Sequence, residues 1–150
     1  MMASCPDEQG GSVLFGRRML PTIPAGDLAR ARAWYADKLG FTTGQEEAAA
    51  VLYRRGEDRI FLLFSSPGAG TAQHQVAAWV VEDLAAEVAE LRSRGVEFEE
   101  YDQPGLRTVD GIAVTPVGKA AWFKDSEGNV LTITQLGYST TGVGSSGSGA

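Results

Sequence analysis

The stretch AGDLARARAWYADKLGF, residues 25–41, decides the fold, because it carries the start, the apolar face and the end of one amphipathic helix. Asp27 is the expected N-cap, since a short carboxylate accepts hydrogen bonds from the first free backbone amides of a helix. Gly40 is a typical stop, because glycine adopts the left-handed conformation in which many helices end. Apolar residues recur at helical spacing between them, at Leu28, Ala31, Tyr35 and Leu39.

The same design recurs in VEDLAAEVAELRSRGVEF, residues 81–98, where Asp83 is the expected cap and Gly95 the expected stop. Each helix follows a short apolar segment and precedes three strand-like pieces separated by turn residues. The strand-like pieces are residues 19–25, 41–47, 49–55 and 59–65 in the first half, and 74–81, 96–101, 119–124 and 130–135 in the second. The sequence therefore predicts two βαβββ units, over about residues 19–66 and 74–136.

The second unit is longer than the first. Asp27 and Asp83 lie 56 positions apart, whereas Arg59 and Asn129, which open the last predicted strand of each unit, lie 70 apart. The 14 additional residues are placed within residues 100–119, which contain two prolines and three glycines. A long loop in a compact domain is often functional. Because neither unit can bury its own apolar face alone, the strands are expected to form one continuous curved surface.

The length of 150 residues fits one domain with a substantial core. We expect this domain over residues 19–136, with residues 1–18 as a flexible N-terminal arm. Residues 137–150 are rich in glycine, serine and threonine, which predicts a flexible tail.

The charge balance excludes several kinds of partner. A net charge of −6 repels nucleic-acid phosphates and anionic lipid, so neither is an expected partner. No apolar run approaches the roughly 20 residues that span a bilayer, and residues 1–18 lack the features of a secretory signal. Cys5 is the only cysteine, which excludes an intrachain disulfide. A cytoplasmic protein with a small-molecule ligand is the resulting expectation.

A duplicated βαβββ unit with IPAGDLARARAWYADKLGF (residues 23–41) in one half and AAWFKDSEGNVLTI (residues 120–133) in the other resembles the vicinal oxygen chelate superfamily. This superfamily contains the glyoxalase, bleomycin-resistance and extradiol dioxygenase proteins, and the likeness covers about residues 19–136. It implies an α+β fold in which eight strands of a mixed sheet curve into an open barrel around a cavity, with the helices outside. Its metal-dependent members bind a divalent ion through His and Glu side chains on the concave faces.

The resemblance also identifies where those metal ligands would lie. The first-strand His of the family precedes the capping Asp by seven residues, which corresponds to Leu20 and Val76 here. The Glu that follows the Gly-Asn corner by three residues corresponds to Thr132, with Leu62 as its first-unit counterpart. Three hydrocarbon groups and one hydroxyl are poor ligands, so neither a metal nor a cofactor is predicted. His74, the only histidine, lies two positions from Val76 and is expected to be exposed, although a shifted register would bring it inward.

Because strand side chains alternate between faces, residues in phase with these four positions are expected to line the cavity. The ligand-binding candidates among them are Leu20, Thr22, Leu62, Phe64, Val76, Ala78, Thr132 and Thr134, with Ile60, Val80 and Val130 in the same phase. They describe an apolar pocket with a few hydroxyls, which is typical of small-molecule sites. The residues expected to pack in the core beneath the helices are Ile23, Phe61, Leu63, Trp79, Leu131 and Ile133.

Two further ligand-binding candidates come from other positions. Trp122 neighbours the core position Phe123, so alternation turns its indole toward the cavity, where it either stacks on a flat ligand or fills space. Arg107, with Asp110, lies on the long loop, which is expected near the cavity mouth; the alternative is a loop whose charges only keep it solvated. The facing of Tyr53 and Tyr101 is not fixed by the sequence.

Three functions follow from these patterns. The first is a metal-free binding protein that encloses an apolar or aromatic ligand, as the antibiotic-sequestering branch of the superfamily does, with a homodimer implied by the same resemblance. The second is a metal-dependent lyase, isomerase or dioxygenase whose ligands lie at other positions. The third is a metal-free enzyme in which Asp110, Tyr101 or His74 acts as an acid or base.

Overall fold

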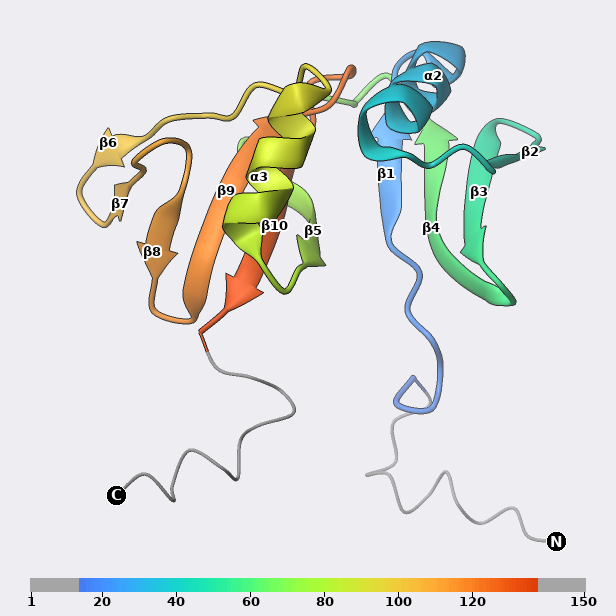
Figure 1. Cartoon of the computed structure of the whole chain (residues 1–150). Helices are drawn as coiled ribbons and strands as arrows, with labels where there is room; N and C mark the ends of the chain where they lie inside the picture. The colour runs from blue at the N-terminus through green and yellow to red at the C-terminus, as the bar shows by residue number, and fades with distance from the viewer. Residues whose placement is uncertain (1–13, 138–150) are drawn as a thin grey trace, which may run out of the picture.

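The structure is a computed structural model that describes residues 14–137, and it has an α+β fold built from two similar modules (Figure 1). Most of the predicted arm, residues 1–13, and the predicted tail, residues 138–150, lie outside the described residues. Among residues 14–137, no helix combines the length and the apolar character that crossing a bilayer requires.

The first module consists of one helix and a four-stranded sheet. Its elements are β1 (Thr22–Ala25), α2 (Leu28–Leu39), β2 (Gln45–Glu47), β3 (Ala50–Arg55) and β4 (Asp58–Ser65). The strand order is β1-β4-β3-β2, with β1 parallel to β4 and the other pairs antiparallel. Thr22 and Leu52 both lie opposite Leu62, on the two sides of β4.

The second module repeats this arrangement. Its elements are β5 (Gln75–Val80), α3 (Leu84–Ser93), β8 (Ala113–Thr115), β9 (Gly118–Lys124) and β10 (Val130–Leu136), with β6 (Asp102–Gln103) and β7 (Leu106–Arg107) as a separate hairpin. The strand order β5-β10-β9-β8 places the parallel pair and the antiparallel pairs at the same positions as in the first module. Two βαβββ modules are therefore confirmed.

Two details differ from the sequence predictions. The eight strands belong to two separate four-stranded sheets, and β1 shares no ladder with β5, so one continuous sheet is absent from the described residues. The prediction of a strand over residues 96–101 is wrong, because this segment pairs with β9 only through the Phe98–Phe123 bridge and one hydrogen bond from the Glu99 amide to the Trp122 carbonyl (2.8 Å). Strand β8, within the segment expected to be a loop, takes the edge position instead.

Both helices begin where the sequence indicates. The carboxylates of Asp27 and Asp83 accept hydrogen bonds from the backbone amides of Arg30 (3.0 Å) and Ala86 (3.1 Å), which satisfies donors that have no partner inside the helix. Gly40 ends α2 with φ of 83°, a conformation that residues with a side chain rarely adopt.

The core lies on the helix-covered face of each sheet. The residues predicted to pack there are buried at Ile23, Phe61, Leu63, Leu131 and Ile133, and partly buried at Trp79. Aromatic contacts join the two modules into one core, because Phe61 meets Trp79 at 6.2 Å and Trp34 stacks on Phe123 at 6.3 Å. We call the opposite faces of the two sheets the open faces.

The corner between β9 and β10 ties the modules together. Buried Asp125 accepts hydrogen bonds from the Tyr35 hydroxyl of α2 (2.7 Å) and from the Asn129 side chain (2.9 Å). Asn129 also donates to the Pro24 carbonyl (2.8 Å) and accepts from the Gly70 amide (3.1 Å). The DSEGN segment thereby connects β1, α2 and the linker between the modules.

Glu127, in the same corner, forms an ion pair with α2. Its carboxylate accepts from Nε and Nη2 of Arg30 (2.9 and 3.0 Å), from the Asp27 amide (2.9 Å) and from the Ser126 hydroxyl (2.7 Å). The side chain of Glu127 is 1% exposed. The Arg30 hydrogen bonds are the main reason that the pKa of Glu127 falls to about 2.

Candidate ligand-binding surface

The open face of the second sheet carries a polar and aromatic cluster. Trp122 lies opposite Thr132 in the β9–β10 ladder, and Thr132 lies opposite Ala78 in the β10–β5 ladder, so the three side chains share one face. Phe123, the next residue along β9, is fully buried on the helix-covered face. Trp122 therefore has the orientation that alternation predicts.

Gln75 organises this cluster, and sequence reasoning missed it. Its side-chain oxygen accepts hydrogen bonds from the Trp122 indole nitrogen (3.0 Å) and from the Thr132 hydroxyl (2.9 Å). A β-bulge makes this possible, because Val130 pairs with Gln75 whereas Leu131 pairs with Ala77. Counting back from Asp83 leads to Val76, which the bulge leaves without a ladder partner, so no simple signal in the sequence identifies Gln75.

Tyr101 forms the second aromatic wall of the cluster. Its ring meets the Trp122 ring edge-on, with centroids 5.6 Å apart and planes at 82°. The backbone holds Tyr101 in place, because its amide donates to the Thr108 hydroxyl (2.8 Å) and its carbonyl accepts from the Thr108 amide (2.9 Å). Burial, followed by the nearby charge of Glu99, raises the pKa of Tyr101. The phenol is therefore protonated near neutral pH and acts as a donor rather than a base.

The open face of the first sheet is apolar. Leu62 and Phe64 on β4 and Leu20 before β1 are partly buried, whereas Thr22 is exposed. Leu52, which the sequence reasoning did not consider, lies beside Leu62 on β3 and is 8% exposed. The alternation of β3 contained the signal for Leu52, since Val51 and Tyr53 are its core-facing neighbours.

The remaining candidates are distributed along β5 and β10. Ala78 and Val80 on β5 are exposed, and Thr134 on β10 is partly buried and donates to the Lys119 carbonyl (3.0 Å). Val76 and Ala78 line a cavity of about 570 Å³ at the seam between the modules. Its other walls include Ile23, Phe61 and Trp79, and among residues 14–137 its only charged lining residue is Arg55. This cavity extends the apolar surface from β5 toward β1.

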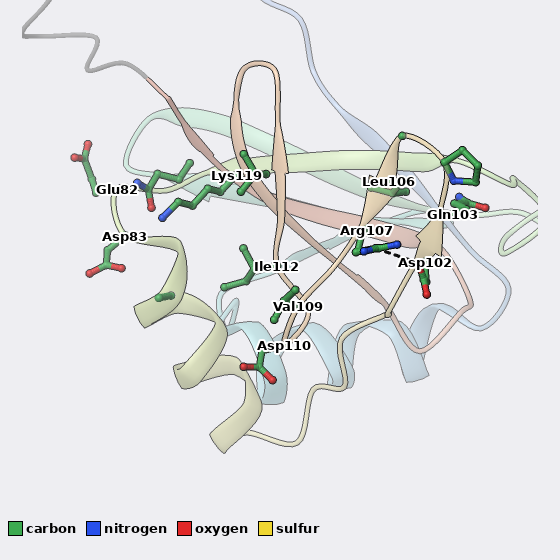
Figure 2. A pocket seen from close by; sticks show the side chains of 15 residues that line it. Glu82, Asp83, Asp102, Gln103, Leu106, Arg107, Val109, Asp110, Ile112 and Lys119 are labelled. Atoms are coloured by element: carbon green, nitrogen blue, oxygen red, sulfur yellow. Dashed lines mark hydrogen bonds and ion pairs between the residues drawn. The ribbon is translucent and has the colours of Figure 1, made fainter.

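Arg107 and Asp110 lie apart from this cluster. Both line a groove of about 1190 Å³ between the start of α3, the β6–β7 hairpin and β8 (Figure 2). Arg107 is paired with Asp102 (3.1 Å) on the exposed hairpin. The residues of β9 and β10 that line the groove are Lys119 and Gln135, which lie opposite each other and share the helix-covered face with Ile133. The structure thus separates the loop charges from Trp122 and Thr132.

The structure also shows where two further candidates, His74 and Tyr53, lie. His74 is exposed, and its Nδ1 lies 2.8 Å from the Gln75 carbonyl oxygen, which does not bring the ring to the cluster. Tyr53 is buried in the core, where its ring stacks on Phe61 at 4.4 Å. Neither residue belongs to the open faces.

The residues at the family's metal-ligand positions do not fit a metal ion. Leu20, Leu62 and Val76 offer hydrocarbon groups, and the hydroxyl of Thr132 is engaged with Gln75. Among residues 14–137, no three His, Cys, Asp or Glu side chains are grouped so that they fit around one ion. A divalent cation requires several electron-pair donors at one point, which this surface does not provide.

Comparisons with known proteins agree with this architecture. The family model described as the glyoxalase/bleomycin resistance protein/dioxygenase superfamily matches residues 19–133. No curated protein sequence matches the chain.

Solved structures with the same fold include binding proteins and an enzyme. A bleomycin-binding protein complexed with bleomycin has a TM-score of 0.60 and 22% identity, with 79% of this chain and 97% of that chain covered. TnmS3, an antibiotic-binding protein from Streptomyces sp. CB03234, has a TM-score of 0.56 and 22% identity, with 81% and 98% covered. A lactoylglutathione lyase from Agrobacterium tumefaciens has a TM-score of 0.54 and 21% identity, with 80% and 93% covered. At these identities the likeness concerns the fold alone.

Proposed function

Because the chain belongs to the glyoxalase/bleomycin resistance protein/dioxygenase superfamily, we propose that it is a metal-free protein that binds an apolar or aromatic small molecule on the open faces of its sheets. One observation carries this proposal. The family's metal-ligand positions hold Leu20, Leu62, Val76 and Thr132, and the single oxygen among them is hydrogen-bonded to Gln75.

The cluster on the second sheet suits a flat ligand. Trp122 and Tyr101 meet nearly at a right angle, so a ring that stacks on the indole face presents its edge to the phenol. Both hydrogen bonds to Gln75 use its side-chain oxygen, which leaves the amide group as a donor for a ligand carbonyl. An aromatic ligand with a hydrogen-bond acceptor at its edge fits these three groups.

A homodimer forms part of the proposal. On the first sheet, Leu20, Leu62 and Phe64 are only partly covered within one chain, and on the second sheet Val80 is 66% exposed. Apolar surface of this kind is stabilised when a second subunit or a ligand removes it from water. The proposal therefore places the ligand between open faces contributed by two copies of the chain, in the cytoplasm, where a protein with one cysteine needs no disulfide.

Tryptophan fluorescence tests this proposal. The probes are metal-free bleomycin and the aromatic dye anilinonaphthalene sulfonate, titrated into the wild type, Trp122→Phe and Trp34→Phe. Trp34 is the matched control, because it packs on Phe123 in the core. Quenching that disappears in Trp122→Phe and persists in Trp34→Phe supports the proposal. Quenching that is unchanged in Trp122→Phe, or its absence with both probes, refutes it.

Elemental analysis separates the proposal from a metal-dependent lyase, isomerase or dioxygenase. Protein prepared without a chelator should contain no stoichiometric Zn, Ni, Mn or Fe, and one such ion per chain would favour the enzyme instead. A metal-free enzyme has less support from the geometry, because Asp110 and His74 lie away from Trp122 and the Tyr101 phenol is a poor base. Mass spectrometry of the incubated probe would reveal turnover.

A further inference from the structure

Two edge strands border the seam between the modules without pairing with each other. β1 and β5 are the inner edge strands of their sheets, and no ladder joins them in the part of the chain that the structure describes (Figure 1). The cavity of about 570 Å³ lies between them, and we call it the seam cavity. Pro21 and Ile23 line it from the first module, and Val76, Ala78 and Trp79 line it from the second. Its volume is within the range typical of small-molecule sites.

Three aromatic side chains of the seam cavity are fixed by contacts with one another. The Phe61 ring meets the rings of Phe41 and Trp79 edge-on, at 5.0 and 6.2 Å between centroids and 81° and 89° between planes. Phe61 is also 3% exposed, so the cavity reaches the core between the modules. The apolar wall is therefore formed before any ligand arrives.

The spacing of these rings favours a chain over a flat ring system. Phe41 and Trp79 are the nearly parallel pair, with planes at 30° and centroids 6.1 Å apart. A flat ligand between two rings needs a separation of roughly 7 Å, which is twice the contact distance of carbon atoms. An unbranched chain needs only apolar surface along its length, and Val76 and Ala78 continue that surface on β5.

The charge at the seam cavity is positive and unpaired. Arg55 is its one charged lining residue among residues 14–137, and within the same residues its guanidinium has no hydrogen-bond or ion-pair partner. Asp58, on the turn that follows Arg55, is paired with Arg18 (2.6 Å). Residues 54–59 together with Arg17 and Arg18 contain five arginines and two carboxylates, so this end of the module is basic although the whole chain is acidic. A planar guanidinium suits a carboxylate, which it binds through two hydrogen bonds.

We infer that the seam cavity is a second binding site, for a carboxylate with an unbranched apolar chain. The carboxylate pairs with Arg55, and the chain lies along Phe61, Val76 and Ala78. Trp122 and Tyr101 do not line this cavity, so the site does not rest on the proposed function. An amine with the same chain is rejected, because its charge would meet only that of Arg55.

Backbone amide NMR with octanoate tests the site in the full-length protein. Shifts should map to residues 55, 60–61 and 76–79, and octylamine, the cation with the same chain length, should cause none there. Octanoate should bind more tightly than butanoate, by about two- to fourfold for each added CH₂ group, because the cavity removes the chain from water. Absence of shifts at these residues, equal binding of octylamine, or equal affinities for butanoate and octanoate would overturn the site.

The matched variants are Arg55→Gln and Arg59→Gln. Both residues are exposed and belong to the same β-hairpin, so the change in net charge is the same, but Arg59 does not line the cavity. Arg55→Gln should weaken octanoate binding about two- to fivefold, which is typical of an exposed ion pair, and Arg59→Gln should leave it unchanged. Equal weakening by both would show a general charge effect and overturn the site.

Trp122→Phe separates this site from that of the proposed function. It should leave the affinity for octanoate unchanged, and loss of octanoate binding in this variant would overturn the seam site. Results with Arg55→Gln do not bear on ligand binding at Trp122, since Arg55 lies on the first module and Trp122 on β9.

Discussion

Replacement of Glu127 by Gln tests how the ion pair between the modules contributes to stability. The carboxylate accepts four hydrogen bonds while 1% exposed, and its pKa falls from 4.5 to about 2. A shift of this size corresponds to about 3 kcal/mol at roughly 1.4 kcal/mol per unit. Because the Arg30 side chain is 58% exposed, solvent screens part of this energy. We expect Glu127→Gln to lower the free energy of unfolding by about 2 kcal/mol at neutral pH.

The pH dependence of this loss is the sharper test. The carboxyl of Glu127 binds its proton near pH 4.5 in the unfolded chain but only near pH 2 in the folded chain. Its contribution is therefore complete above pH 4.5 and disappears as the pH falls toward 2. The difference between wild type and Glu127→Gln, measured by urea unfolding, should be smaller at about pH 3.5 than at about pH 7.

The control for this experiment is Glu46→Gln. Glu46, on β2, pairs with Arg32 of α2, the helix that also carries Arg30, but the side chain of Glu46 is 69% exposed. Its replacement should therefore change the free energy of unfolding by less than about 1 kcal/mol. Equal effects of the two substitutions on the free energy of unfolding, or a Glu127→Gln effect that does not decrease in acid, would refute the contribution assigned to the Glu127–Arg30 ion pair.

Three other predictions concern buried hydroxyls, glycines and metals. Tyr35→Phe should lower the free energy of unfolding in urea by about 1.5–3 kcal/mol, because buried Asp125 loses a hydrogen-bond donor. Tyr53→Phe should leave it unchanged or raise it, because the buried Tyr53 hydroxyl has no partner within residues 14–137. Gly70→Ala should destabilise more than Gly56→Ala in thermal unfolding. Both glycines have positive φ, but only at Gly70 would a Cβ collide with a backbone carbonyl, that of Glu127. Incubation with a chelator should leave the melting temperature unchanged, and a clear decrease would contradict the proposal that the protein is metal-free.

The architecture was predictable because local signals and the global fold agree. Asp27, Asp83 and Gly40 have the capping roles that their residue types favour, and period-two alternation separates buried Leu63 from partly exposed Leu62. The error over residues 96–101 arose because an apolar and acidic alternation is typical of a strand. Here Thr108 forms hydrogen bonds with the backbone of Tyr101 and closes the base of the β6–β7 hairpin, which forms a sheet of its own. Strand β8 therefore occupies the edge of the second sheet.

The site was less predictable because it depends on register and on tertiary placement. One bulge in β5 brings Gln75 to Trp122 and Thr132, and no local residue pattern announces it. Likewise, a loop position does not reveal which face of a sheet the loop covers. The sequence places Asp110 near the cavity mouth. In the structure, Arg92 of α3 donates a hydrogen bond to the Asp110 carbonyl, and Asp110 lies beside α3.

The residues that make the superfamily recognisable are those that assemble the modules. Asp125 and Asn129 of the DSEGN segment use their side chains on Tyr35, on the Pro24 carbonyl and on the Gly70 amide, so substitutions there would separate β1 and α2 from the second sheet. Thr132, three residues beyond Asn129, belongs to the open face, where its hydroxyl donates to the Gln75 side chain and makes none of these contacts. The corner that joins the modules and the open face are therefore formed by neighbouring but different residues. The chain consequently keeps the corner while it carries a hydroxyl, that of Thr132, at the position where the resemblance implies a metal-ligating carboxylate.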